Sequence, residues 1–219
     1  MAKIGDAEKI AQNHVISLFR DADILGYKYY GSRRACENSN IEIEVLKTFL
    51  QKQGYSETLS DRAVEELRKE SKNLQSGLYA ANKLVYSLLK YGVKIRENPG
   101  EAEKTIFFIN WEHPAKNEFA IAEEVTIIGA CEKRPDIVVY VNGIAIAVIE
   151  LKKSAISVAN GIRQNITNQK EHFIQSFFST IQFTMAGNTS EGLRYGAVDT
   201  GSSERYYTEW KNDENPLDV

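Results

Sequence analysis

The sequence predicts an α/β fold in which a central mixed β-sheet is flanked by helices and preceded by an N-terminal helical extension. Apolar residues recur at the helical spacing of three and four through most of the first 90 positions, whereas residues 105–152 hold β-branched runs separated by turn residues. A further helical pattern at 158–178 separates these runs from another at 195–200. Such a crossover predicts strands of mixed direction.

The expected elements follow in order along the chain. An amphipathic helix over 9–19 leads into a polar, Tyr- and Gly-rich segment that ends near residue 39 and offers few core residues. Helices should follow at 41–53, 61–72 and 77–90, the last capped by Gly92, and strands at 105–111, 119–128, 134–141 and 144–152. We therefore expect an N-terminal helix and arm at 1–40, a main domain at 41–210, and the polar start of a linker at 211–219.

Composition indicates a protein that can bury a sizeable core and does not cross a membrane. The 219 residues are 42% hydrophobic and 26% charged, and no apolar stretch is long enough to span a bilayer. The chain starts without a signal-peptide pattern, and Cys36 and Cys131 have no C-x-x-C spacing. These features are typical of the reducing cytoplasm.

The most informative motif is a predicted β-hairpin with two acids and a lysine at its open end. Asn142-Gly143, the strongest short hairpin signal, separates the apolar runs 137–141 and 144–149. Asp136 precedes the first run, and Glu150 and Lys152 follow the second. The three charged side chains should therefore meet across the two strands.

This combination of residues is typical of a metal-dependent phosphodiesterase. A phosphodiester repels an attacking hydroxide, so a site must neutralise charge and supply a nucleophile. Mg²⁺ does both with hard oxygen ligands and retained waters, and Asp136, Glu150 and the backbone carbonyl of Leu151 are candidates to bind it. Lys152 shares a strand face with Glu150, so its ammonium can favour the deprotonated form of a water at the site.

The register of the hairpin decides whether this site can form. A plain two-residue turn at Asn142-Gly143 would place Asp136 opposite Ile149, on the face away from Glu150. A three-residue loop with a G1 bulge at the glycine would reverse that parity. We therefore predict a bulge at the glycine, or a break in pairing at Pro135-Asp136.

The same residues have a simpler interpretation. An acid at a strand end and E-x-K on a neighbouring strand also occur on solvated sheet edges. Glu150 and Lys152, however, end the apolar run 144–149, which has the pattern of a buried strand. Charges at the end of a buried strand favour a cleft or a partner over bulk solvent.

A third carboxylate is expected at the start of the helix 41–53. On a helical wheel Glu42 falls near the centre of the apolar face and Glu44 on the opposite side, so Glu42 should point at the hairpin. A metal would satisfy such a carboxylate. The alternative is a capping box over Ser39-Asn40-Ile41-Glu42, in which Glu42 only caps the helix.

A set of short segments, spread in order over most of the chain, carries a resemblance to a known protein family. They are Asn40-Ile41-Glu42, Gly54-Tyr55-Ser56, 78–83, 91–93, 117–124, 134–153, 161–165, 186–188 and 192–196. Together with the hairpin motif they resemble the N-terminal endonuclease domain, of PD-(D/E)xK type, of the R (HsdR) subunit of type I restriction enzymes.

The resemblance implies a restriction-endonuclease-like core, with the endonuclease domain at 41–210. It also implies that Asp136, Glu150 and Lys152 are the catalytic triplet, that Glu42 is the helix carboxylate, and that Mg²⁺ is the cofactor. Double-stranded DNA would be the substrate, and the modification (M) and specificity (S) subunits would be partners. Because the chain has no G-x-x-x-x-G-K-[ST] phosphate loop, we expect the ATP-driven DNA translocase of the family to lie outside it.

One motif departs from the family. The Q-x-x-x-Y motif corresponds here to 164–168, with Asn168 where Tyr is expected. The apolar wheel of 158–178 places Gln164 nearly opposite the packed face, so it should approach DNA or the metal site only if the helix starts irregularly, and otherwise be solvated. Lys153 and Arg163 are further candidates for DNA contact.

The net charge of −3 predicts weak intrinsic affinity for DNA, because phosphate contacts normally need a basic surface. DNA would then be delivered by other parts of the enzyme. Two other functions stay open: a nuclease of the same fold in repair or junction resolution, and a non-catalytic docking module whose hairpin charges contact a protein. Mg²⁺ binding that depends on Asp136 and Glu150 would argue against docking.

Overall fold

The computed structural model describes residues 6–198 and 203–210. The helices are α1 (Asp6–Arg20), α2 (Ile43–Lys52), α3 (Glu57–Lys72), α4 (Leu78–Tyr91) and α5 (Val158–Asn168), and the 3-10 helices are η1 (Pro114–Lys116), η2 (Gln175–Ser179) and η3 (Glu204–Tyr206). The strands are β1 (Lys28–Ser32), β2 (Val93–Ile95), β3 (Lys104–Ile106), β4 (Phe119–Glu123), β5 (Ile127–Ile128), β6 (Glu132–Lys133), β7 (Ile137–Val141), β8 (Ile144–Leu151), β9 (Phe183–Asn188), β10 (Gly192–Gly196) and β11 (Thr208–Glu209).

A seven-stranded sheet forms the centre of the described chain, in the order β1-β4-β7-β8-β9-β10-β11. The strands β4, β7 and β8 are antiparallel neighbours, whereas β1 pairs with β4 and β8 pairs with β9 in parallel. β2-β3 and β5-β6 form two separate two-stranded sheets. The predicted α/β class with a mixed central sheet is confirmed.

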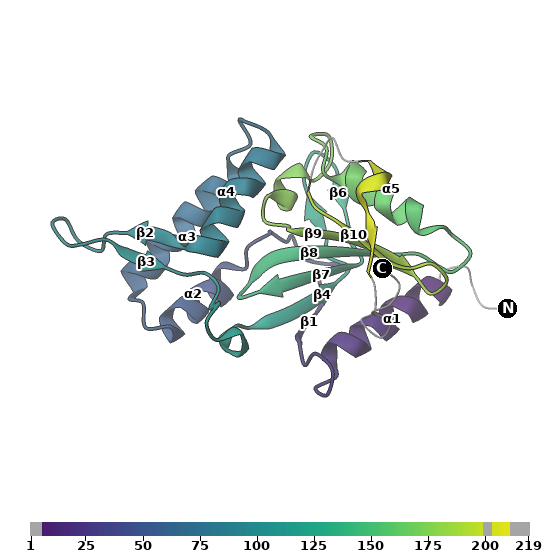
Figure 1. Cartoon of the computed structure of the whole chain (residues 1–219), viewed down its shortest axis with the longest axis horizontal. Coiled ribbons are helices and arrows are strands. Elements are labelled where there is room, and N and C mark those ends of the chain that lie inside the picture. The colour runs from purple at the N-terminus through teal and green to yellow at the C-terminus, as the bar shows by residue number, and fades with distance from the viewer. Residues whose placement is uncertain (1–5, 199–202, 211–219) are drawn as a thin grey trace, which may run out of the picture.

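Helices cover both faces of the sheet (Figure 1). On one face Ile16 of α1 packs with Ile121, Ile137 and Ile149. On the other face Val138 and Val148 pack against η2 and the start of α4, and α5 covers the end of β8 and β9.

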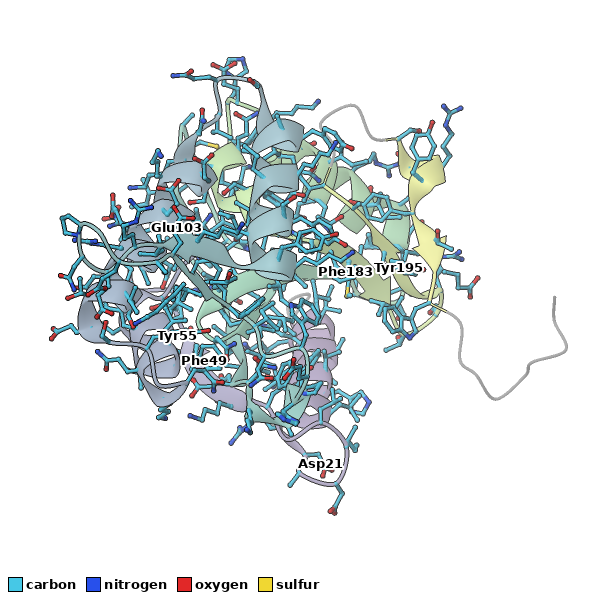
Figure 2. All side chains as sticks on the ribbon, turned by 60° about the vertical axis from the view of Figure 1, so that its left-hand side comes forward. Asp21, Phe49, Tyr55, Glu103, Phe183 and Tyr195 are labelled. Carbon is cyan, nitrogen blue, oxygen red and sulfur yellow. The ribbon has the colours of Figure 1, made fainter. Side chains whose placement is uncertain are left out.

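A second apolar cluster lies where α2, α3 and α4 meet the turn end of β7 and β8. Figure 2 shows Phe49 and Tyr55 together in this helical part, well separated from Phe183 and Tyr195 on β9 and β10. The turn end of the hairpin is therefore packed in apolar side chains, which leaves its other end for polar groups.

The N-terminal segment is part of the sheet, although the sequence predicted an arm with few core residues. β1 forms the edge strand beside β4, and Tyr27 and Tyr29 pack against the cluster under α1. Aromatic residues pack well on a half-buried strand even when the surrounding composition is polar. Residues 6–32 are therefore part of the same folded domain as the other described residues.

The helix predicted at 158–178 is too long. α5 ends at Asn168, whose carbonyl accepts a hydrogen bond from the Ile174 N–H at 3.2 Å, so the chain folds back before η2. Phe177 and Phe178 are buried in η2. Their spacing fits the apolar pattern of α5, although the helix has already ended. Apolar periodicity records burial, and burial does not require one unbroken element.

Other boundaries also shift. The strand predicted at 105–111 is only β3, because Phe108 and Ile109 are buried outside any strand. The sequence did not indicate β9, whose residues FTMAGN are mostly small or polar and which lies between β8 and β10. The strand predicted at 195–200 begins earlier as β10, and residues 199 and 200 lie outside the described part, as does the linker predicted at 211–219.

The predicted N-terminal helices are present, and two caps explain their ends. α3 starts at Glu57, four residues before the predicted position, because the Ser56 hydroxyl accepts the Leu59 N–H at 3.2 Å. Gly92 ends α4 as predicted: its φ is 73°, and a Cβ there would lie 2.6 Å from the Ile106 carbonyl oxygen.

None of the helices in the described ranges combines the length and the apolar composition needed to cross a bilayer. Cys36 and Cys131 are both free thiols.

Candidate active site

The turn between β7 and β8 is a plain two-residue turn. Asn142 and Gly143 have φ values of 52° and 82°, which is the type I′ geometry that the Asn-Gly pair favours. The Asn142 side chain is buried and accepts the Glu118 N–H at 2.7 Å. A Cβ at Gly143 would lie 2.8 Å from the Glu42 carbonyl oxygen, so α2 packs directly on this turn.

The predicted bulge is present, but its predicted position at the glycine was wrong. Tyr140 pairs with Ala145 whereas Val139 pairs with Ala147, so Ile146 is the extra residue in β8. Its carbonyl turns to the other neighbour and accepts the Gln182 N–H at 2.7 Å. The bulge moves the register by one residue, and it occurs inside the strand because the type I′ turn itself is regular.

This bulge places Asp136 on the same face as Glu150. Ile137 pairs with Ile149, so one step further the two acids lie opposite each other, and directly opposed residues share a face. The Asp136 carboxylate accepts the Leu151 N–H at 2.7 Å. Because the N–H and C=O of one strand residue point to the same side, the Leu151 carbonyl also faces Asp136.

Glu150 is fully buried beneath α5, with 0% of its side chain exposed. Gln164 Nε2 donates to Glu150 Oε2 at 2.7 Å, and Lys152 Nζ lies 3.8 Å from the same oxygen. The Lys152 side chain is 15% exposed, so it reaches solvent where the buried acid does not. α5 approaches closely because Gly161 has no side chain over Glu150.

Of the two positions left open for Gln164, the structure has the one beside Glu150 and not the solvated one, and it needs no irregular start of α5, because the helical wheel was wrong. The wheel used Phe173 and Phe177, which lie beyond the end of α5. The face that packs on the sheet instead contains Gly161, Asn165 and Asn168 beside the aliphatic residues, and Gln164 lies next to that face. Asn168, at the position where the family motif has Tyr, is buried at the last turn of α5.

Glu42 does not join these residues. It is the N-cap of α2, and its N–H donates to the Gly143 carbonyl at 2.7 Å, so it lies at the turn end of the hairpin. Six strand residues lie between Gly143 and Glu150, which corresponds to roughly 20 Å. Glu44 is exposed, as expected.

The capping box also does not form. α2 starts at Ile43, and the Ser39 hydroxyl bonds the backbone of Ile41 instead, at 3.3 Å to its N–H and 2.7 Å to its carbonyl. The Glu42 side chain makes no capping hydrogen bond. Both sequence-based roles of Glu42 required a helix that started two residues earlier.

Comparison with protein families gives one match that covers most of the chain. The family described as the type I restriction enzyme R protein N terminus matches residues 7–203, which include every described element from α1 to β10. The chain belongs to this family.

Two relatives of this R-protein N-terminal domain carry names of the same kind. One is the type I restriction enzyme MjaIXP endonuclease subunit of Methanocaldococcus jannaschii, 29% identical over 145 residues. The other is the type I restriction enzyme SsaAORF53P endonuclease subunit of Staphylococcus saprophyticus, 26% identical over 118 residues. The matched regions cover 63% and 52% of this chain but only 13% and 12% of the relatives.

The two basic candidates for DNA contact lie differently in the R-protein domain. Lys153 is half-buried in the turn after β8, next to Lys152. Arg163 is half-exposed on α5, where its guanidinium donates to Glu204 at 2.8 Å and to Asn160 at 2.7 Å. Arg163 therefore joins α5 to η3 in this structure.

Sequence reasoning missed a polar cluster on the α1 face, beside the backbone of Asp136. Glu123, at the end of β4, accepts hydrogen bonds from Lys9 at 2.8 Å, Gln12 at 3.1 Å and the Tyr29 hydroxyl at 2.8 Å. Burial pushes the pKa of Glu123 up, but the hydrogen bonds from Lys9 and Tyr29 outweigh it and hold the pKa below its ordinary 4.5. Burial and Glu123 together raise the pKa of Tyr29 to about 12.

A sequence signal for this cluster existed. Gln12 lies four residues before Ile16 and seven before Phe19, so it falls on the apolar face of α1. A polar residue on a packed face needs a partner.

The donor set at the hairpin fits a small hard cation. Within residues 6–198 and 203–210, no group of three or more His, Cys, Asp or Glu side chains is placed to hold a metal. Asp136, Glu150 and the Leu151 carbonyl supply oxygen only, and Mg²⁺ is commonly held by one or two carboxylates with waters filling the other positions. This part of the domain could therefore hold Mg²⁺, but not a metal that requires sulfur or imidazole.

Proposed function

We propose that this domain is the Mg²⁺-dependent endonuclease of a type I restriction enzyme and hydrolyses phosphodiester bonds in double-stranded DNA. The observation that carries the proposal is the Ile146 bulge, which brings Asp136 opposite Glu150 on one face of the hairpin. A structural hairpin has no need of two opposed acids, one of them fully buried. Membership of the R-protein family supports the choice of DNA as substrate.

The metal would be held by Asp136, Glu150 and the carbonyl of Leu151. Bound Mg²⁺ supplies neutralisation of the phosphate charge and a nucleophile near neutral pH. The protein contribution is to fix the ligands, and hydrogen bonds to ligating groups are what orient them. The Leu151 N–H holds the Asp136 carboxylate, and the Gln164 amide holds the Glu150 carboxylate.

Lys152 has a separate role. Its ammonium lies close to the buried Glu150, on the side that leads to solvent. A positive charge there favours the deprotonated form of an attacking water and attracts a phosphate oxygen. Lys153 extends the basic surface by one residue toward the DNA.

The remaining steps belong to the whole enzyme. The matched segments cover only about an eighth of the length of the two relatives. We propose that an ATP-driven motor outside the chain translocates DNA to this site, and that M and S subunits select the sequence, in the cytoplasm. A net charge of −3 agrees with DNA delivered by other parts, since this domain lacks the basic balance of an independent DNA-binding protein.

The test uses Asp136→Asn, Glu150→Gln and Lys152→Ala in the full-length enzyme, with Glu44→Gln as an exposed control. Loss of a metal ligand or a charge-stabilising group should lower the rate of DNA cleavage by about 10²-fold or more. ATP turnover measured in parallel should persist, because the motor is a separate module. The control should cut and hydrolyse ATP like the wild type.

Two results would contradict the proposal. A variant that cuts at the wild-type rate removes its residue from the site. If calorimetry detects no Mg²⁺ binding that depends on Asp136 and Glu150, the hairpin charges serve a protein contact instead. Loss of both cleavage and ATP turnover would identify a residue that couples or stabilises the enzyme rather than one that acts in the chemistry.

A further inference from the structure

The backbone of Asp136 is held from the far side of the sheet by a side chain of α1. Gln12 Nε2 lies 3.2 Å from the Asp136 carbonyl oxygen and 3.1 Å from Glu123 Oε2. The Gln12 side chain is only 3% exposed. One buried amide thus joins the proposed metal ligand to the end of β4.

The other groups around Gln12 fix its orientation. Lys9 Nζ lies 3.4 Å from Gln12 Oε1 and 2.8 Å from Glu123 Oε2, so the amide oxygen faces the ammonium and the amide nitrogen faces the two acceptors. Tyr29 completes the cluster from β1 through the other oxygen of Glu123. The amide is therefore held directly by Lys9, Glu123 and the Asp136 carbonyl.

Asp136 needs such support because it lies just outside the strand ladder. β7 starts at Ile137, and Asp136 follows Pro135, which has no N–H to donate. The Asp136 carbonyl also accepts the N–H of Glu124 at 2.9 Å, and Glu124 has a φ of 52°, in the left-handed region that non-glycine residues rarely adopt. This local geometry is kept by the contacts around it, and Gln12 supplies one of them.

We propose that Gln12 is a positioning residue for the metal site: from the α1 face of the sheet, anchored by Glu123, it fixes the backbone of Asp136 so that the carboxylate meets Glu150. This inference rests on the proposed function, since it concerns the same ligand pair. Gln12 touches neither the metal nor the substrate. Its effect should therefore appear in the metal dependence of the reaction.

The decisive comparison is Gln12→Leu against Asn13→Leu in the full-length enzyme. Leucine fills most of the volume of the glutamine side chain but has no hydrogen-bond donor, and Asn13 is the exposed neighbour on the same helix. Cleavage rates are measured across a series of Mg²⁺ concentrations, and Mg²⁺ binding is measured by calorimetry. Removal of groups that orient metal ligands typically weakens metal affinity by 10- to 100-fold, and a contact to the backbone belongs at the lower end.

We expect Gln12→Leu to raise the Mg²⁺ concentration for half-maximal cleavage about tenfold, with the rate largely restored at saturating Mg²⁺. Asn13→Leu should leave the curve unchanged. An unshifted Mg²⁺ curve in a folded Gln12→Leu protein would overturn the proposal, because a purely structural role lowers the melting temperature without changing metal dependence.

A second variant covers the case in which Gln12→Leu fails to fold. Glu123→Gln keeps an acceptor for the amide but removes the charge that anchors it, so it should shift the Mg²⁺ curve in the same direction by a smaller factor. A folded Glu123→Gln protein with a wild-type curve would then refute the role of the cluster. The proposed function is tested separately by Asp136→Asn. If that variant still binds Mg²⁺ and cuts DNA, both proposals fail. If Asp136→Asn does not cut DNA but Gln12→Leu has an unshifted Mg²⁺ curve, only the role of Gln12 is refuted.

Discussion

Adding one methyl group at Gly161 should move α5 away from the proposed site. A Cβ at this position would lie 2.9 Å from the Ala186 Cβ and 3.5 Å from the Glu150 Cβ. Carbon atoms in contact prefer about 3.5 to 4.0 Å, so Gly161→Ala requires a displacement of roughly 0.6 to 1 Å. Neither neighbour is a flexible side chain that can rotate away.

The displacement should weaken the contact between α5 and Glu150. The Gln164–Glu150 hydrogen bond is 2.7 Å long, so the same movement brings it near the limit of about 3.5 Å. Overpacking costs about 1 to 3 kcal/mol, and the gain from replacing a helical glycine offsets about 1 kcal/mol of it. We expect a net loss of up to about 2 kcal/mol, which lowers the melting temperature by up to about 8 °C in a domain of this size.

Thermal unfolding by circular dichroism and the rate of Mg²⁺-dependent cleavage would measure the two effects. The matched variant is Gly161→Ala with Ala186→Gly, which removes the opposing methyl and should recover most of the cleavage rate. If Gly161→Ala is more stable than the wild type and adding Ala186→Gly does not raise the cleavage rate, the packing of α5 on β9 does not require a glycine at position 161.

Two further predictions concern stability. The pKa of Glu123 is lowered from 4.5, so its interactions stabilise the fold above that pH and are lost as the pH falls below it. The difference in melting temperature between wild type and Glu123→Gln should therefore be largest above about pH 5 and shrink toward pH 3. A difference that stays constant with pH would contradict this prediction. Gly143→Ala should cost about 2 to 4 kcal/mol in urea unfolding, because it combines a φ of 82° with a backbone clash at 2.8 Å. Gly54→Ala is its control, since Gly54 has a φ of 89° and open space around it, and equal losses in the two variants would show that the clash with α2 is unimportant.

Much of the fold could be predicted because local signals and burial agreed. The Asn-Gly turn, the Gly92 cap and the helices of the N-terminal half each depend on neighbouring residues. β1 and β9 escaped prediction because their place in the sheet comes from pairing with distant strands, which leaves little trace in a five- or six-residue window. Where apolar residues were buried outside regular elements, as at Phe108 and Phe177, the pattern extended an element too far.

Only part of the candidate site could be predicted from the sequence. The need for a bulge followed from strand parity, whereas its position at Ile146 depends on which backbone group bonds the next strand at Gln182. Glu42 was misplaced because its wheel assumed a helix that starts two residues too early. Gln12 was overlooked because nothing local connects α1 to a hairpin more than a hundred residues away.

The hydrogen bonds around Asp136 differ greatly in sequence separation. The bond between Asp136 and Leu151 closes a loop of 15 residues, whereas the bond between Gln12 and Asp136 closes one of 124. Closing the longer loop costs about 2 kcal/mol more in chain entropy. The two proposed metal ligands can therefore be brought together by a single hairpin, whereas the proposed adjustment by Gln12 requires that the N-terminal helix has docked. If Gln12 acts as proposed, an R protein whose α1 is detached would keep Asp136, Glu150 and Lys152 but lose the geometry proposed to make them active.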